Sequence, residues 1–299
     1  MPELPEVQTI VVGLRRPLVG AIIADVRLRR RDIVRPRHAN LPAALRGQII
    51  RAIDRRGKYI LIRFASGSRL AIHLGMTGRL TVHEGDSPLA RHTHLMVTLA
   101  PGGHEDRGSK MEDGGTAGPN PRSSMIRPLS SILHPQSSLR FTDPRRFGRI
   151  RLLPPGESLP LGPEPFGLRP AQLYRRLART RRAIKTALLD QKLIAGLGNI
   201  YADESLFASG IDPRTPASRL SLNQARRLNR AVKMTLRRAI GHRGSTLRDY
   251  VDAQGEAGAF QELHNVYGRA GLPCRACSTP VRRLVLGGRS TRFCPKCQA

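Results

Sequence analysis

Four cysteines at the end of the chain restrict its fold more than any other feature. They fall within the last 26 of 299 residues as two Cys-x-x-Cys pairs with sixteen residues between them, Cys274 with Cys277 and Cys294 with Cys297. This spacing is typical of a four-thiolate zinc site, whereas a disulfide scaffold would spread its cysteines along the chain. The sequence therefore predicts one structural Zn²⁺ in a small ribbon-like finger over 269–299, in preference to two disulfides or free thiols.

The charge of the chain is extreme for its size. The formal net charge is +29, and 45 of the 51 basic residues are arginine. Arginine makes bidentate contacts with phosphate and guanine that lysine cannot match, so nucleic acid is the expected partner. The alternatives are a merely solvated surface and a genomic bias toward arginine. No apolar stretch approaches the roughly 20 residues of a membrane span, and we expect a soluble, cytoplasmic protein with no membrane partner.

Short apolar runs separated by turn residues predict strands of an antiparallel sandwich or barrel in the first half of the chain. The expected strands cover 22–28, 48–53, 59–64, 69–74, 95–99, 139–142 and 149–153. Between about 101 and 138 the sequence turns to Gly, Ser, Pro and charge with little periodicity, which predicts a mobile insertion. Five prolines within 154–165 predict an interdomain linker.

Apolar residues at helical spacing follow the linker and predict a mainly helical domain. Ser221 and Gln224 have the spacing of a capping box ahead of an amphipathic run. The predicted fold class is therefore α+β with several domains. Their expected ranges are 1–153 for the N-terminal β domain with its insertion, 154–165 for the linker, 166–268 for the helical domain and 269–299 for the finger.

The first six residues, Met-Pro-Glu-Leu-Pro-Glu, place a proline beside two carboxylates. Removal of the initiator Met would leave Pro2 as a secondary amine, whose unperturbed pKa of about 7.7 to 8.0 leaves part of it unprotonated near neutrality. Such an amine can attack the anomeric carbon of a sugar and form an iminium that permits elimination. Glu3 and Glu6 share one helical face, so one could donate a proton while the other stabilises positive charge. The alternative is that the prolines merely start a helix.

Two further segments carry residues suited to DNA. The run Gly-Leu-Gly-Asn ends at Asn199 before an apolar helix, and free N–H groups at a helix start attract phosphate, although this is also an ordinary turn between helices. Asp143–Gly148 sets Arg145 beside Phe147 between two strands. A Phe beside Arg on a tight loop could wedge into a base stack, whereas the commoner arrangement puts the Phe in the core.

Several single residues are weaker candidates. Lys58 precedes a predicted strand and could reach a phosphate, and His92 or its neighbour His94 could contact DNA. A solvated side chain is the default for all three. Met76 is a core residue unless the glycines on either side display it on a turn.

Together these features resemble the bacterial formamidopyrimidine-DNA glycosylase family, whose members excise oxidised purines from DNA and cleave the abasic site. The resemblance runs through Pro2–Glu6, Gly57–Tyr59, Gly75–Gly78, Asp143–Gly148 and Gly196–Tyr201 to the four cysteines. It implies an N-terminal two-sheet β-sandwich, a helix-two-turn-helix domain and a C-terminal zinc finger. It also implies a monomeric base-excision repair enzyme that acts on double-stranded DNA containing 8-oxoguanine or formamidopyrimidines, associated with the bacterial nucleoid through DNA binding.

The resemblance also implies roles for individual residues. Pro2 would be the nucleophile, Glu3 the acid/base at the sugar, and Glu6 a stabiliser of the intermediate. Lys58 is counted with these catalytic residues. The residues implied to hold phosphates beside the lesion are Lys58, Asn199, Tyr267 and Arg289. Those implied to fill the gap of the everted nucleotide are Met76, Arg145 and Phe147, with Arg145 facing the orphaned cytosine. Lys185 and the loop Ser245–Phe260 are implied to recognise the base.

Two alternatives stay open at this point. The endonuclease VIII branch has a similar architecture but favours oxidised pyrimidines, usually begins Pro-Glu-Gly-Pro-Glu, and lacks a comparable loop; Leu4 and the loop favour the purine branch. A non-catalytic zinc-finger protein that binds damaged DNA is the second alternative, and the intact Pro2–Glu3 pair argues against it. The insertion at 101–138 departs from the family pattern, which has a short strand connection there.

Overall fold

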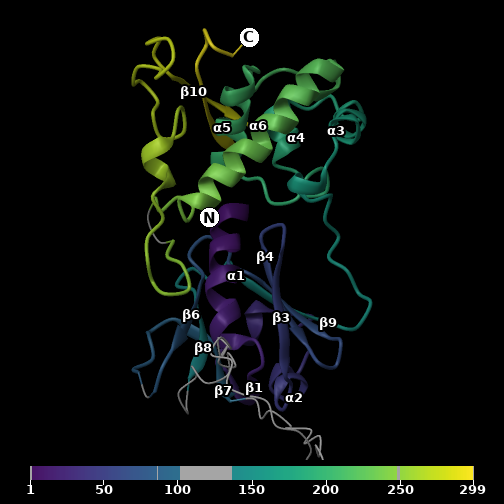
Figure 1. The fold of residues 1–299 in the computed structure, drawn as a ribbon, viewed down its shortest axis with the longest axis vertical. Coiled ribbons are helices and arrows are strands. Elements are labelled where there is room, and N and C mark those ends of the chain that lie inside the picture. Colours follow the sequence, from purple (N-terminus) through teal and green to yellow (C-terminus); the bar gives the residue numbers. More distant parts are fainter. Residues whose placement is uncertain (1, 86, 102–136, 248–249, 299) are drawn as a thin grey trace, which may run out of the picture.

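The computed structural model describes residues 2–85, 87–101, 137–247 and 250–298 (Figure 1). The insertion predicted at 101–138 lies almost entirely outside this described part, so its mobility stays a prediction. No helix in the described ranges has both the length and the hydropathy that crossing a membrane requires.

Two sheets form the N-terminal half, which confirms the predicted two-sheet β domain. One sheet has the order β1-β7-β8-β6, formed by Ile22–Leu28, Thr93–Ala100, Ser138–Thr142 and Arg79–His83. The other has the order β2-β9-β5-β4-β3, formed by Val34–Arg35, Arg149–Leu153, Arg69–His73, Tyr59–Phe64 and Ile50–Arg56. Neighbouring strands are antiparallel except β2 with β9. The short helices η1 (Arg31–Ile33) and α2 (Leu41–Leu45) lie between strands.

All seven predicted strands are present with small shifts at their ends, and two strands were missed. β6 was missed because its five residues begin and end with charged or polar side chains, although Leu80 is buried and Val82 packs against the core. β3 begins at Ile50 rather than at residue 48, and the Gln48 carbonyl accepts from Ile23 N at 2.9 Å beside β1.

Helix α1 (Leu4–Leu18) runs along the sheets and packs on β3, β4 and β6 (Figure 1). Its apolar residues recur at helical spacing and are buried, except Val12, which is exposed. Proline suits its first turn, where backbone N–H groups have no partner within the helix. The second half of the chain is helical, as predicted. Its elements are η3 (Pro165–Gly167), α3 (Pro170–Leu177), α4 (Ile184–Leu188), α5 (Asn199–Ser209), η4 (Ala217–Arg219), α6 (Leu222–Gly241) and η5 (Phe260–Leu263).

The predicted capping box is present at the start of α6. Gln224 N donates to Ser221 Oγ at 3.2 Å, and Ser221 N donates to Gln224 Oε1 at 2.8 Å. The finger follows as a hairpin of β10 (Arg282–Leu286) and β11 (Arg289–Phe293). Gly287 and Gly288 join its strands with φ of +54° and +72°, the left-handed backbone that a two-residue hairpin turn requires.

Two large apolar cores exchange residues across the junction between the β and helical halves. Leu4, at the start of α1, belongs to the core of the helical half, whereas the rest of α1 belongs to the core of the β half. In the opposite direction, Tyr250 and Ala253 pack into the β core. The N-terminus is therefore fixed where the two halves meet.

Candidate functional site

The site is built around the start of α1, which is tied to the segment before α5. Pro2, Glu3 and Glu6 are buried, and Leu4 N donates to the Gly196 carbonyl at 3.1 Å. The ideal Cβ of an alanine at Gly196 would lie 2.7 Å from Leu4, so a glycine is needed for this close approach. The three N-terminal site residues are thereby held at the junction.

Glu3 caps a helix from the other half of the molecule. Its carboxylate accepts backbone N–H groups of Gly198 at 2.6 Å, Ile200 at 2.9 Å and Tyr201 at 3.4 Å. These donors belong to the first turn of α5, whose unpaired N–H groups and dipole favour a negative charge. The carboxylate therefore has one defined position beside Pro2.

Glu6 is buried in a cage of three donors. It accepts from Glu3 N at 2.8 Å, Ser245 N at 2.8 Å and the Tyr201 hydroxyl at 2.5 Å. Burial raises the pKa of Glu6 above its ordinary value, the charge of Glu3 adds to this, and the Tyr201 hydrogen bond opposes it. Glu6 therefore ionises at a higher pH than a solvated glutamate, and the hydrogen bond from Tyr201 limits this rise in pKa.

Lys58 is brought to the same junction by the turn between β3 and β4. Gly57, with φ of +56°, precedes it, and an alanine Cβ there would lie 3.3 Å from Ala195. Burial lowers the pKa of Lys58, the charges of Glu3 and Glu6 act against this, and Arg289 lowers it further. Lys58 is thus within electrostatic range of both carboxylates and of the finger.

Replacing Tyr201 with Phe tests whether Glu6 must be ionised for the reaction. The change removes a donor that lowers the pKa of Glu6, so the pKa rises further. If ionised Glu6 stabilises a positive intermediate, the acid limb of the pH–rate profile moves to higher pH, by up to about one unit. Single-turnover base excision measured from pH 5 to 9 gives this limb directly.

Tyr174→Phe is the matched control, because Tyr174 is a partly exposed tyrosine on α3, outside the junction. Its profile should coincide with that of the unmodified protein. An acid limb that stays in place in Tyr201→Phe would mean that Glu6 ionisation does not control the step.

Two exposed loops carry the residues expected to fill a gap in DNA. Met76 is 41% exposed and Phe147 is 48% exposed, and the Arg145 guanidinium lies 5.0 Å from the Phe147 ring centre. Buried Asp143 holds the second loop by accepting from Thr77 Oγ1 at 2.5 Å and from the N–H of Gly148 at 2.8 Å. Phe147 is therefore not a core residue.

The structure separates the two histidine candidates. His94 is buried, with Nε2 2.8 Å from the Asp143 carbonyl oxygen. His92 is half-buried and lines a hollow together with four arginines, Arg29, Arg30, Arg91 and Arg146. His94 lines the same hollow, and its hydrogen bond supports the loop of Arg145 and Phe147. The contact of His92 with DNA stays a prediction.

The three remaining phosphate candidates occupy helix, loop and finger. Asn199 is the first residue of α5, and its Oδ1 is buried without a hydrogen-bond partner among the described residues. The Tyr267 ring lies 4.4 Å from the Arg292 guanidinium, and exposed Arg289 is the first residue of β11.

Sequence reasoning missed Glu204, whose carboxylate accepts the Tyr267 N–H at 2.9 Å. Acidic residues inside the otherwise apolar α5 were the available signal.

Lys185 is fully buried in an ion pair. Its Nζ lies 2.7 Å from Asp203 Oδ1 and donates to the Ser290 carbonyl at 2.7 Å, while Asp203 accepts from Arg292 N at 3.1 Å. The pair therefore joins α4 and α5 to β11 of the finger. The lysine is not open to a base in this structure, and its predicted role in base recognition stays a prediction.

The described part of the Ser245–Phe260 loop packs against α1. The Tyr250 hydroxyl lies 3.4 Å from the Glu6 carbonyl oxygen of α1, and Gln254 Nε2 donates to the Gly13 carbonyl at 3.3 Å. Residues 248–249 lie outside the described part. The predicted closure of this loop over a base stays a prediction.

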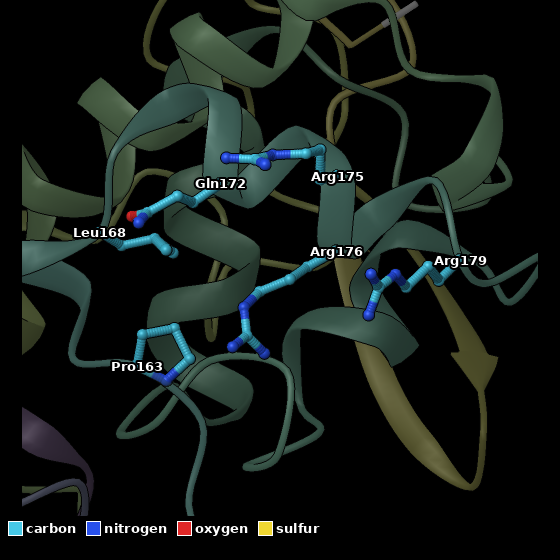
Figure 2. A pocket seen from close by; sticks show the side chains of 6 residues that line it. All are labelled: Pro163, Leu168, Gln172, Arg175, Arg176 and Arg179. Atoms are coloured by element: carbon cyan, nitrogen blue, oxygen red, sulfur yellow. The ribbon is translucent and has the colours of Figure 1, made fainter.

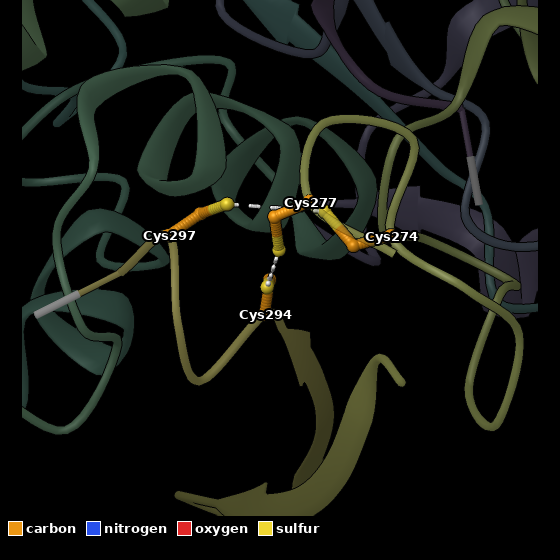
Figure 3. A group of neighbouring side chains, drawn as sticks. All are labelled: Cys274, Cys277, Cys294 and Cys297. Carbon is orange, nitrogen blue, oxygen red and sulfur yellow. Dashed lines mark hydrogen bonds between the residues drawn. The ribbon is translucent and has the colours of Figure 1, made fainter. Parts of the chain in front are cut away.

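The four cysteines form one structural zinc site. Their side chains point toward one another from the loop before β10 and from the segment after β11 (Figure 3). All four Sγ atoms lie within 4.8 Å of one another, with separations of 3.9 Å and 3.4 Å for two pairs. Tetrahedral Zn²⁺ with bonds of about 2.3 Å requires sulfurs about 3.8 Å apart. Four thiolates complete the shell, so the metal supports the fold.

A separate hollow lies beside α3 (Figure 2). Its lining residues are Pro163, Leu168, Gln172, Arg175, Arg176 and Arg179. None of the predicted catalytic or DNA-contacting residues lines it, so it lies outside the site described above.

Comparisons with known proteins agree with this arrangement. The formamidopyrimidine-DNA glycosylase N-terminal domain matches residues 1–110, the H2TH domain of the same family matches 161–251, and the zinc finger found in FPG and IleRS matches 271–299. A formamidopyrimidine-DNA glycosylase of Cupriavidus pinatubonensis is 42% identical over 313 residues, covering 100% of both chains.

Solved structures are similar over nearly the whole chain. MutM (FPG) from Thermus thermophilus is 37% identical with a TM-score of 0.79, covering 99% of this chain and 98% of that one. A Lactococcus lactis FPG mutant, in complex with a Fapy-dG containing DNA, is 30% identical with a TM-score of 0.83, covering 99% of both chains. With its three domains, its buried N-terminal motif and its four-cysteine finger, the chain belongs to the formamidopyrimidine-DNA glycosylase family.

Proposed function

We propose that this chain is a base-excision repair glycosylase that removes 8-oxoguanine and formamidopyrimidines from duplex DNA and then cleaves the abasic strand. One observation carries the proposal: the start of α1, the β3–β4 turn and the start of α5 gather Pro2, Glu3, Glu6 and Lys58 at one junction. Among its relatives, the Lactococcus lactis mutant was solved with a Fapy-dG containing DNA and a MutM with DNA containing carbocyclic 8-oxo-G.

The chemistry follows from a free Pro2 nitrogen once Met1 is removed. The nitrogen attacks C1′ of the lesion nucleotide, the bond from C1′ to the base breaks, and the base leaves with a proton. Glu3 exchanges protons at the sugar as its ring opens, and Glu6 stabilises the positive iminium. Loss of a C2′ proton expels the 3′ phosphate, a second elimination expels the 5′ phosphate, and water releases the amine.

Duplex DNA is held on both sides of the junction. The residues proposed to contact phosphates are Lys58, His92, Asn199, Tyr267 and Arg289. The exposure of Met76 and Phe147, with Arg145 beside the Phe147 ring, supports their proposed insertion into the gap of the flipped nucleotide. Such insertion offsets the cost of unstacking a base.

The proposed organisation is a monomer with a β domain over 1–153, a linker over 154–165, a helix-two-turn-helix domain over 166–268 and a zinc finger over 269–299. Lys185 contributes to base recognition by holding the finger hairpin in place, and the Ser245–Phe260 loop closes over the base. Because the similar proteins are bacterial, we place the enzyme in the cytoplasm, associated with the nucleoid through DNA binding.

Borohydride trapping tests the nucleophile. With a duplex that contains 8-oxoguanine opposite cytosine, borohydride should reduce the iminium and leave a covalent protein–DNA adduct. Pro2→Gly keeps a terminal amine but replaces the secondary amine with a primary one, and its adduct should fall sharply. Mass spectrometry of the active protein should give a chain that begins at Pro2. An adduct that Pro2→Gly leaves unchanged, or a retained Met1 in active protein, would remove Pro2 from this role.

A second duplex that contains thymine glycol, compared with the 8-oxoguanine duplex, separates the alternatives. A pyrimidine-specific enzyme would cleave thymine glycol well above 8-oxoguanine, and a non-catalytic binding protein would retain both duplexes without a nicked product. The proposal requires faster cleavage at 8-oxoguanine.

A further inference from the structure

We propose that the exposed face of α6 is a second contact surface for the phosphate backbone of duplex DNA, outside the lesion site. The helix carries six basic residues and no acidic residue over its twenty positions. Four of the six lie at spacings of four, three and four, which places them in one stripe along the helix. They are Arg226, Arg230, Lys233 and Arg237, and we call them the α6 stripe.

The burial pattern of α6 leaves this stripe in solvent. The apolar face packs in the core of the helical half, while Arg226, Arg230 and Arg237 are exposed and Lys233 is half-buried. Arg226 donates to Asn223 Oδ1 at 3.2 Å, and the Arg237 guanidinium lies 5.7 Å from the Phe166 ring centre. No member forms an ion pair with any described residue.

The α6 stripe differs from the exposed arginines of the β half in its regular spacing along one helix. Some of those arginines have acidic partners, for example Arg27 and Arg46 with Asp25, and Arg63 with Asp54, whereas Arg16, Arg37 and Arg51 form no ion pair with a described residue. In α6, like charges repeat one turn apart with no acidic partner in the helix. Such an arrangement destabilises a helix unless an anion neutralises it.

Duplex DNA is the anion that fits the length of the stripe. The eleven steps along the helix from Arg226 to Arg237 span about 16 Å at 1.5 Å per residue. One DNA strand carries a phosphate about every 3.4 Å of axis, so the stripe matches about five base pairs. The helix leads from the junction near the N-terminus across the helical half, so the stripe extends away from the lesion site (Figure 1). This inference rests on the proposed function only in taking duplex DNA as the anionic polymer that binds the stripe.

The test neutralises three stripe residues in the full-length zinc-loaded protein, as Arg226→Gln/Arg230→Gln/Lys233→Gln. Arg237 is kept because it contacts Phe166. The control is Arg16→Gln/Arg37→Gln/Arg51→Gln, which removes the same charge from exposed arginines of the β half. The probe is an undamaged 30-base-pair duplex, titrated at several salt concentrations.

The stripe variant should bind this duplex roughly ten-fold more weakly near 0.1 M salt. The slope of log affinity against log salt should decrease in magnitude by about 0.9 for each lost phosphate contact. Single-turnover cleavage at saturating enzyme should stay as in the unmodified protein, while the fraction of duplexes cut at two lesions in one encounter should fall.

Equal weakening in stripe and control variants would overturn the proposal, because net charge alone would then explain the result. Unchanged DNA affinity together with lost binding to polyglutamate would also overturn it and would assign the stripe to an acidic protein partner. If the unmodified protein cuts no lesion, the proposed function is refuted. The comparison of stripe and control variants on undamaged duplex would still test the α6 stripe, because it measures binding alone.

Discussion

Gly198→Ala is expected to lower single-turnover base excision by about 100-fold or more, the scale of loss that follows a displacement of about 1 Å in a reacting group. The ideal Cβ of an alanine at this position would lie 2.3 Å from Glu3 Cδ, and the Gly198 N–H is itself a donor to that carboxylate. Its backbone, with φ of −130°, accepts alanine without strain. The added methyl group therefore acts on Glu3 and removes no chemical group.

Gly241→Ala provides the matched control. This glycine ends α6, and among the described residues no atom outside its own stretch of helix lies within 4 Å of an ideal Cβ there. The control should excise at the normal rate and keep or slightly raise the melting temperature. Normal excision by a folded Gly198→Ala protein would show that the capped position of Glu3 does not matter for the reaction.

The sequence indicated which residues are candidates for this site but not how they are held. Pro2, Glu3 and Glu6 were recognisable because a proline beside two carboxylates suits an imine mechanism. That Glu3 caps α5 could not be predicted, because its donors lie about 195 residues away and the contact depends on how the two halves pack. The same holds for the cage around Glu6, where Ser245 donates across 239 positions.

Local patterns predicted most of the fold. Strands such as Tyr59–Phe64 and helices such as α6 follow from periodicity and capping, which operate over a few residues. The exchange of Leu4 and Tyr250 between the two cores has no local signal, because both are apolar residues that would be buried in either core. Lys185 also shows the limit of local patterns. The family resemblance implied a base contact for it, whereas its burial depends on Asp203 and on β11.

Lys185→Met is expected to lower the free energy of unfolding by about 3 to 5 kcal/mol at pH 8, because it leaves the Asp203 charge buried without a partner. Burial raises the pKa of Asp203 to about 7 even with Lys185 present, which itself lowers it, so the pKa rises further in the variant. When the pKa of a carboxyl group is higher in the folded than in the unfolded protein, its contribution to stability is complete at a pH below the pKa of the unfolded state. That contribution is lost as the pH rises through the pKa of the folded state. The deficit should therefore be smaller at pH 5, as urea unfolding at both pH values would measure.

The double variant Lys185→Met/Asp203→Asn separates support of the fold from contact with the base. Neither position then carries a buried charge, and the Asn side-chain oxygen can still accept from Arg292 N, the bond that Asp203 makes at 3.1 Å. Stability should return to near that of the unmodified protein, and excision of 8-oxoguanine should return with it, because the finger keeps its position. A double variant that is stable yet loses 8-oxoguanine while still cleaving abasic sites would instead assign Lys185 a direct contact with the base. That contact would require the ion pair to open in the DNA complex, since the Lys185 side chain is 0% exposed here.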